Sequence, residues 1–386
     1  MNILLLGYSD SVFTRDFCLH VLGKENINTV ILTPTPTKQY GQDYIGNHVK
    51  EIEWPDFFRK GIRKNLGALP SIIKEWRNLE AKIGLGNRID ALHVHYVEPL
   101  HLVYFFPFWR RAKKRVLTFW GSDLLHASKL KLWLFPFFLK HATSIVLMIQ
   151  SQCDYFQEVF GHKYDDKIHI IDFGNSLLNV IDDVMQNYTA DECKRHFDLP
   201  LDKLIVHVGY NASRAQQHKE VLENIVLLSR DILQKMKFVF HISYGFGHDF
   251  DAYKQQLTQI MDVAQMDYAF IDTYLQGEEL AMLRRTCDLF VYGQKTDARS
   301  ASPLEYIYAG AEFVCAGWLA GNYELLDQAG IRYYSYDDFG ELDKAIQLCL
   351  EKIDSPEGKI SDRGRKAIRD EISWDSLAEK WRALYE

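Results

Sequence analysis

The stretch Leu204-Ile-Val-His-Val-Gly209 repeats, in the middle of the chain, the pattern that opens it, Asn2-Ile-Leu-Leu-Leu-Gly7. Each is a short apolar run that ends in glycine and is followed by a segment with helical spacing. Continuous apolar strands are typical of parallel sheets, whose two faces are both covered by helices. The two stretches therefore predict two α/β domains, each opening on a buried strand.

Further apolar runs extend both halves of the chain. They lie at residues 29–32, 91–94, 115–119 and 144–149 in the first half, and at 238–243, 268–271, 289–292 and 313–316 in the second. Strands that alternate with helices predict doubly wound sheets. We expect two Rossmann-like domains facing a cleft, at residues 1–185 and 186–370, and a closing helix at 371–386 that packs back on the first domain.

Composition and charge indicate the cellular compartment and exclude several classes of protein. The chain of 386 residues has a net charge of -7, yet 16 Lys and Arg oppose 6 Asp and Glu between Trp54 and Lys140. Its six cysteines form no Cys-x-x-Cys pair, which fits a reducing cytosol and predicts neither a zinc site nor disulfides. The opening strand lacks a signal peptide's basic flank, and no apolar run approaches the ~20 residues of a membrane span. We expect a cytoplasmic protein.

Cations follow the opening strand of the second half. The turn Gly209-Tyr-Asn211-Ala-Ser-Arg214-Ala-Gln-Gln-His-Lys219 leads into a predicted helix. Ligands bind parallel sheets at the carboxyl ends of strands, where helix N-termini attract anions. Arg214 and Lys219 therefore suit a diphosphate whose charge grows as a glycosidic bond breaks. A solvated basic helix start explains the pair equally well.

Two carboxylates follow the strand at 289–292. Asp297 lies in a loop, and Glu305 follows a predicted helix start at Ser302-Pro303. A carboxylate at this place can accept hydrogen bonds from ribose hydroxyls. A first-turn carboxylate stabilised by the helix dipole is the alternative explanation for Glu305.

These segments together resemble the retaining, E-x7-E bacterial glycosyltransferases of the GT-B fold (glycosyltransferase family 4-like). Asp297 takes the place of the first Glu, and residues 303–310 are similar to the helix that carries the second. The Gly209 turn is similar to the family's diphosphate turn, and Tyr274-Leu275-Gln-Gly277 to its donor-side loop. The resemblance implies donor binding by Gly209, Asn211, Arg214, Lys219, Leu275, Ser302 and Glu305.

The first half resembles the family on the acceptor side. The relevant segments are Asp90-Ala-Leu-His93-Val-His95-Tyr and Thr118-Phe-Trp120-Gly-Ser-Asp123. Asp123 is a candidate catalytic residue together with Arg214, Lys219 and Asp297, although an Asp after Gly-Ser is commonly a helix cap. Many members carry His where this chain has Trp120, so that role does not carry over. The acceptor-side candidates are Gly7, Ser9, His95 and Trp120.

The resemblance implies a glycosyltransferase that moves a sugar from a nucleotide diphosphate sugar to a lipid-linked or cell-surface polysaccharide acceptor, with retention at the anomeric carbon. Two cations at the start of a predicted helix predict transfer without a metal or other cofactor. A sugar nucleotide epimerase on the same fold stays open, as does an inactive partner subunit, because Asp297 and Trp120 depart from the family pattern. A dinucleotide oxidoreductase is disfavoured, since Gly7-Tyr-Ser-Asp lacks the glycine fingerprint.

Three segments interleave aromatic residues with cations, at 54–64, 104–115 and 129–140. Such segments can bind anionic headgroups, which predicts a peripheral position on the inner face of the membrane. Core aromatics with solvated cations are the alternative for each segment. The acidic total argues against nucleic acid as a partner. The sequence leaves the oligomeric state open.

Overall fold

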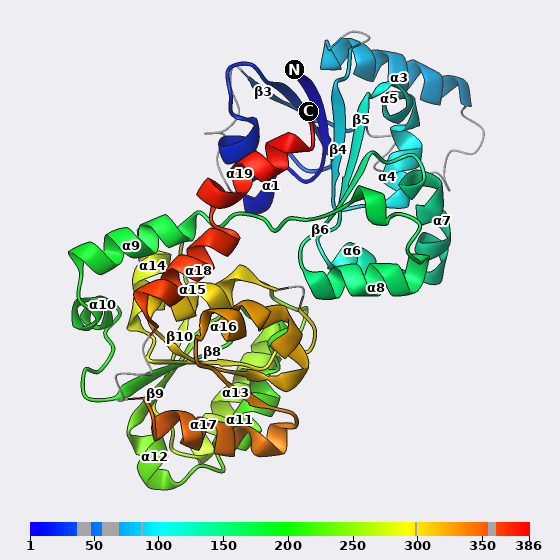
Figure 1. The fold of residues 1–386 in the computed structure, drawn as a ribbon. Coiled ribbons are helices and arrows are strands. Elements are labelled where there is room, and N and C mark those ends of the chain that lie inside the picture. Colours follow the sequence, from blue (N-terminus) through cyan, green and yellow to red (C-terminus); the bar gives the residue numbers. More distant parts are fainter. Residues whose placement is uncertain (37–47, 56–68, 86–87, 298, 354–359) are drawn as a thin grey trace. The chain divides into compact units, whose positions relative to one another are not determined.

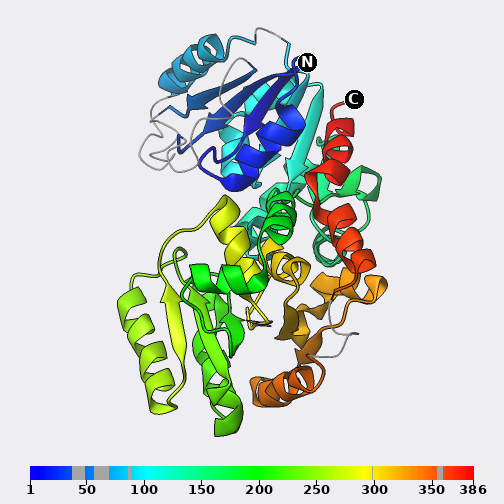
Figure 2. The ribbon, with the colours of Figure 1, turned by 90° about the vertical axis from the view of Figure 1, so that its left-hand side faces the viewer.

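The computed structural model describes residues 1–36, 48–55, 69–85, 88–297, 299–353 and 360–386. These residues form two compact units, Met1–Gly174 with Trp374–Glu386, and Asn175–Ser373. Each unit is built on one parallel sheet with helices on both of its faces (Figures 1 and 2). The α/β class and the two doubly wound sheets predicted from the sequence are confirmed.

The first unit holds a seven-stranded sheet in the order β3-β2-β1-β4-β5-β6-β7. Alternate side chains of β1 enter opposite cores, Ile3 and Leu5 on one face and Leu4 and Leu6 on the other. This alternation explains why the strand is apolar throughout. The strands are β1 (Asn2–Leu6), β2 (Asn28–Thr33), β3 (Val49–Glu53), β4 (Ala91–His95), β5 (Lys114–Thr118), β6 (Ser144–Leu147) and β7 (Ile168–Ile170).

Helices cover both faces of this sheet. The helix α1 (Val12–Phe17), which continues as a π-helix over Cys18–Leu22, lies on the same side as α19 (Trp374–Ala383), and the other face carries most of the remaining helices (Figure 1). Those helices are α3 (Leu69–Ile83), α4 (Pro99–Tyr104), α5 (Phe106–Arg111), α6 (Ser122–Leu125), α7 (Lys129–Leu139) and α8 (Gln150–Phe160).

The closing helix α19 belongs to the first unit. Its Trp381 is fully buried and donates through Nε1 to the carbonyl of Asp172 at 3.0 Å. Beyond the helix, the Tyr385 hydroxyl lies 2.6 Å from Nδ1 of His93, whose Nε2 lies 2.7 Å from the Thr118 hydroxyl. The His93 imidazole therefore joins the end of the chain to the middle of the sheet.

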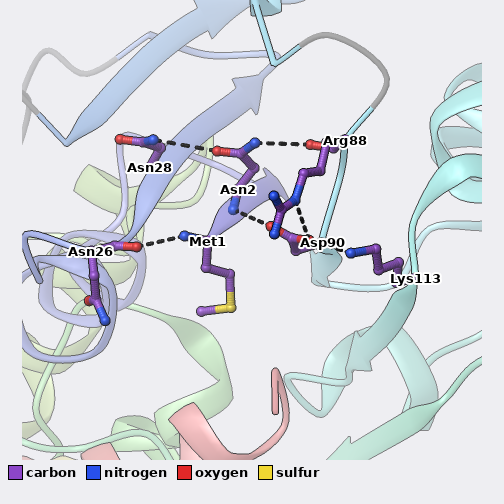
Figure 3. A network of polar contacts seen from close by, with 7 residues as sticks. All are labelled: Met1, Asn2, Asn26, Asn28, Arg88, Asp90 and Lys113. Carbon is purple, nitrogen blue, oxygen red and sulfur yellow. Dashed lines mark hydrogen bonds and ion pairs between the residues drawn. The ribbon is translucent and has the colours of Figure 1, made fainter.

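A polar network closes the amino ends of these strands (Figure 3). Asp90 accepts the backbone N–H of Asn2 at 2.9 Å, Nζ of Lys113 at 2.9 Å and Nε of Arg88 at 3.3 Å. Burial raises the pKa of Asp90, but these donors outweigh it and lower the pKa to about 2. The carboxyl ends, where ligands bind such sheets, lie at the opposite edge.

The second unit has a six-stranded sheet in the order β10-β9-β8-β11-β12-β13. The strand order reverses between β8 and β11, which is where ligands bind open α/β sheets. The strands are β8 (Leu204–Val208), β9 (Met236–His241), β10 (Tyr268–Ile271), β11 (Leu289–Tyr292), β12 (Glu312–Ala316) and β13 (Tyr334–Tyr336).

Two groups of helices pack on this second sheet. The helix α11 (His218–Ile225) contacts α13 (Phe250–Val263) and α17 (Leu342–Leu350). The other group holds α9 (Leu177–Asn187), α10 (Ala190–His196), α14 (Gly277–Thr286), α15 (Ala301–Ala309) and α18 (Asp362–Ile372). Two further α-helices of this unit are α12 (Arg230–Gln234) and α16 (Glu324–Ala329).

The units divide earlier than the sequence suggested. The polar residues near 185 lie at the end of α9, which packs on α14 and α15 and so belongs to the second unit. The chain passes between the units after Gly174 and returns after Ser373 rather than at 371. The prediction followed the polar residues of the loop after α9. The boundary between the units lies before α9 instead, because this helix packs on the second unit.

Candidate functional site

The turn after β8 lies at the point where the strand order of the second unit reverses. Gly209 has φ +63°, and a Cβ there would lie 2.7 Å from Nε2 of His218. Asn211, which is largely buried, accepts the backbone N–H of Ser213 at 2.9 Å and closes an Asx turn. Gln217 then adopts a left-handed conformation, φ +54°, and starts α11. Glycine is thus required at 209 both by conformation and by the approach of His218.

Gly209→Ala should lower the free energy of unfolding by about 2 to 3 kcal/mol, since the methyl group adds a clash to an unfavourable φ. Urea unfolding measures the loss. Gly277→Ala is the matched control, because Gly277 also has positive φ, +56°, but open space around it. A smaller loss of about 1 kcal/mol is expected there. Equal losses would show that the contact with His218 contributes nothing.

Arg214 and Lys219 both lie at this turn, each half-exposed and each paired with a carboxylate. Arg214 donates to Asp249 through Nε at 3.3 Å and Nη2 at 2.5 Å, and donation to that carboxylate raises the pKa of Arg214. Lys219 Nζ lies 3.5 Å from a carboxylate oxygen of Glu223 one helical turn further on. The predicted cations are therefore placed at the mouth of α11, and the guanidinium is already oriented.

Asp297 is engaged inside its own loop. Its carboxylate accepts the Ser300 backbone N–H at 2.8 and 2.9 Å, the Ser300 hydroxyl at 2.9 Å and the Tyr292 hydroxyl at 2.9 Å. The Tyr323 hydroxyl lies 3.4 Å away. In this structure the carboxylate orders the loop that precedes α15, and a role toward the donor stays a prediction.

Glu305 lies further along α15 than the sequence suggested, because the helix begins at Ala301 rather than at Ser302-Pro303. One carboxylate oxygen accepts Nε of the fully buried Arg284 at 3.0 Å, and the other accepts Nδ2 of Asn175 at 2.9 Å. Arg284 also reaches the Tyr306 hydroxyl at 2.8 Å and the hydroxyl of Ser302 at 3.4 Å. Burial by itself lowers the pKa of Arg284, but the neighbouring Glu305 carboxylate outweighs burial and raises it.

Sequence reasoning missed Arg284. The only signal in the sequence is a cation on the buried face of α14. Its partner Glu305 lies on another helix, and no local spacing connects the two residues. Leu275, the other predicted donor residue, lies half-buried in the loop between β10 and α14. The structure thus brings Glu305 and Ser302 together through Arg284, while Leu275 lies on the neighbouring loop.

In the first unit, Asp123 joins two loops at the carboxyl edge of the sheet. Its carboxylate accepts the backbone N–H of Val97, after β4, at 2.6 Å, and that of Trp120, after β5, at 2.9 Å. Burial raises the pKa of Asp123 to about 7, against the lowering effect of the backbone donors. The side chain holds the Trp120 loop against the Val97 loop, and its catalytic role stays a prediction.

The other acceptor-side candidates gather around β1 and β4. Gly7 follows β1, and a Cβ there would lie 3.2 Å from Cβ of His95. Ser9 is fully buried and its backbone N–H donates to the Thr33 hydroxyl at 3.1 Å. The half-buried Trp120 ring lies 5.9 Å from the His95 ring. These residues lie near one edge of the sheet, and their role toward an acceptor stays a prediction.

His95 itself is 1% exposed, and neither ring nitrogen has a hydrogen-bond partner in the described part of the chain. It packs against Phe17 and Phe173, and burial lowers its pKa to about 3. Above pH 6.5 the imidazole is neutral in both folded and unfolded chains. As the pH falls below 6.5, the unfolded chain binds a proton that the folded unit excludes, so stability is lost.

His95→Phe should therefore remove about 2 kcal/mol of the stability that the wild type loses between pH 7 and pH 5. The replacement costs no hydrogen bond, because the imidazole makes none with the described residues. Urea unfolding at several pH values tests this. His126→Phe, at an exposed position, should leave the pH dependence unchanged. If His95→Phe has the wild-type slope, the imidazole is protonated or hydrated in the folded protein.

The sequence segments with aromatics and cations separate in the structure. In residues 104–109, Tyr104, Phe105, Phe108 and Trp109 are buried in the core, so this segment is not the exposed aromatic surface that was predicted. On α7, Leu130, Trp133 and Phe137 are exposed by 65%, 74% and 55%. Residues 56–64 of the first segment lie outside the described residues.

Within the described ranges, no three His, Cys, Asp or Glu side chains cluster as a metal site would require. No helix among them is long and apolar enough to cross a bilayer.

The chain resembles known proteins in part of its sequence and in its fold. Residues 2–152 match the family model described as glycosyl transferase 4-like. No curated protein matches the chain in sequence. Sucrose-phosphate synthase from Thermosynechococcus elongatus is similar in structure, with a TM-score of 0.72 and 14% identity over 100% of this chain and 98% of that one.

Two further solved structures have the same fold. Anabaena Alr3699/HepE, in complex with UDP and glucose, has a TM-score of 0.71 and 14% identity over 99% of this chain and 98% of that one. WaaG, a glycosyltransferase involved in lipopolysaccharide biosynthesis, has a TM-score of 0.65 and 10% identity over 99% of both chains. The predicted GT-B fold and the resemblance to GT-B glycosyltransferases are confirmed.

Proposed function

We propose that this GT-B glycosyltransferase moves a sugar from a nucleoside diphosphate sugar to a lipid-linked or cell-surface saccharide, without a metal and with retention. One observation carries the proposal: Arg214 and Lys219 lie at the turn after β8, where the strand order reverses. Such cations stabilise a departing diphosphate, which removes the need for a divalent ion. The HepE complex with UDP and glucose supports a nucleotide sugar as donor.

The test is donor consumption. Purified protein is incubated with UDP-glucose and with GDP-mannose, with and without a crude lipid-linked acceptor fraction and with chelator. We expect nucleoside diphosphate release that depends on acceptor and survives chelation, with a product that keeps the donor's anomeric configuration. Donor conversion without acceptor would favour an epimerase. Absence of both binding and turnover would favour an inactive partner subunit.

The α7 face, defined as Leu130, Trp133 and Phe137, supports a position at the membrane. The three residues repeat at helical spacing and so form one stripe, with exposed Lys129 and Lys140 at its ends. Exposed apolar stripes of this kind mark interaction sites. Because the segment from 54 to 140 carries ten more cations than anions, the occupant that we propose is an anionic bilayer surface.

Trp133→Ala with Phe137→Ala should weaken binding to vesicles of phosphatidylglycerol and phosphatidylcholine at least about tenfold, since each ring contributes about 1 kcal/mol by burial. Vesicle co-sedimentation measures the change. Leu227→Ala with Val263→Ala, at two equally exposed positions of the second unit, is the control and should bind as the wild type does. Equal vesicle binding by both double variants would exclude the α7 face as the docking surface.

A further inference from the structure

The first turn of α13 holds the guanidinium of Arg214. Asp249, just before the helix, accepts Nε and Nη2, and the ring of Tyr253 lies beneath the guanidinium carbon at 4.4 Å from its centroid. Tyr253 is 3% exposed, so this platform is fixed by the core. Nη1 of Arg214 bonds no other described residue. The guanidinium is therefore oriented while part of its donor capacity stays unused.

The hydroxyl of Tyr253 lies at the other end of the turn, where α11 begins. Burial raises the pKa of Tyr253 to about 12, and the backbone N–H groups of Lys219 and His218, which belong to the first turn of α11 and have no intrahelical partner, point toward this hydroxyl and oppose that rise. The hydroxyl also lies 3.4 Å from Nδ1 of His218. A backbone N–H can only donate, so the phenolic hydrogen is left to point at Nδ1. Nδ1 is then an acceptor, and Nε2 carries the imidazole hydrogen.

Nε2 of His218 is directed at the Gly209 turn. The imidazole is fully buried, and Nε2 has no partner in the ranges that the structure describes. It lies only 2.7 Å from the place of a Cβ on Gly209. Burial lowers the pKa of His218 to about 4, so the ring is neutral near pH 7. A buried N–H without an acceptor costs free energy unless a ligand or a shift of the turn supplies one.

We propose that Tyr253 is the positioning residue of the diphosphate turn, and that His218 is an additional N–H donor to the diphosphate, set in that tautomer by the Tyr253 hydroxyl. The ring of Tyr253 orients Arg214, and its hydroxyl orients both the start of α11 and His218. One side chain thus connects both cations of the turn. The inference rests on the proposed function, because the ligand is the donor's diphosphate.

The experiment compares the affinities for UDP and UMP by titration calorimetry, with GDP and GMP as the second pair. Tyr253→Phe keeps the ring under Arg214 and removes the hydroxyl. We expect it to weaken UDP binding about fivefold, the worth of one hydrogen bond, and to leave UMP binding unchanged. Tyr253→Leu also removes the ring and should weaken UDP binding further. His218→Phe should likewise lower the ratio of UDP to UMP affinity.

The control is Tyr268→Phe, which removes a hydroxyl bonded to Asp262 at 2.8 Å elsewhere in the same unit. It should leave both affinities unchanged. General loss of structure would weaken UDP and UMP alike, whereas positioning changes their ratio. If wild-type protein binds UDP but neither Tyr253→Phe nor His218→Phe changes the ratio, the inference alone is overturned. If the wild type binds neither UDP nor GDP, the proposed function is overturned with it.

Discussion

Arg284→Ala is expected to lower the free energy of unfolding by about 3 to 5 kcal/mol. Arg284 is 2% exposed and Glu305 is 7% exposed, and Nε of the one donates to the carboxylate of the other at 3.0 Å. Removing the guanidinium leaves a buried carboxylate with Asn175 as its remaining neutral donor. It also removes a cation from the face of the Tyr306 ring, 4.2 Å away. Urea unfolding with an unchanged m-value measures the loss.

A double variant separates the lost pair from the lost volume. Arg284→Met with Glu305→Gln removes both charges and should recover most of the stability. Removing one partner of a buried ion pair leaves an uncompensated charge, whereas replacing both partners changes the free energy of unfolding little. Lys219→Ala breaks an exposed pair with Glu223 and should cost less than about 1 kcal/mol. A loss below about 1 kcal/mol in Arg284→Ala would show that water reaches Glu305.

The strands in the middle of both sheets could be predicted because their burial on two faces forces continuous apolar runs. β8, Leu-Ile-Val-His-Val, is of this kind. Three edge strands, β3, β7 and β13, were missed because they lack such runs, whereas the edge strand β10 was predicted at 268–271. β3 has the sequence Val-Lys-Glu-Ile-Glu and buries only Val49 and Ile52, and β7 is three residues long and half-exposed. The sequence of such a segment does not distinguish it from a loop, because its strand conformation depends on pairing with a neighbouring strand.

The sequence could group the residues of the candidate site where they directly follow a strand. Gly209, Arg214 and Lys219 lie within one turn, so local spacing was sufficient to group them. Their partners come from other elements: Asp249 and Tyr253 from the start of α13, and Arg284 from α14. No periodicity connects these helices to the turn, since the contacts arise only when the sheet places β8 beside β9 and β11. Asp297 shows the converse, because Ser300 of the same loop donates to it through both its backbone N–H and its hydroxyl.

Arg214→Ala should lower kcat/KM for the nucleotide sugar by about a hundredfold or more, because one preorganised donor to a developing anion has that effect. Stability should change little, since the side chain is half-exposed and Asp249 returns to water. Initial rates of nucleoside diphosphate release measure the effect. Arg214→Lys keeps the charge but loses the paired donors, so an intermediate rate is expected.

Lys254→Ala is the matched control for Arg214→Ala. Lys254 pairs with Asp272 at 2.7 Å and lies 4.8 Å from the Phe270 ring centroid, as Arg214 pairs with Asp249 and lies over Tyr253. The two cations thus have similar local surroundings, but Arg214 alone of the pair lies in the turn after β8. Lys254→Ala should keep the wild-type rate. If Arg214→Ala keeps it too, the diphosphate is bound elsewhere, and the turn after β8 is not the donor site.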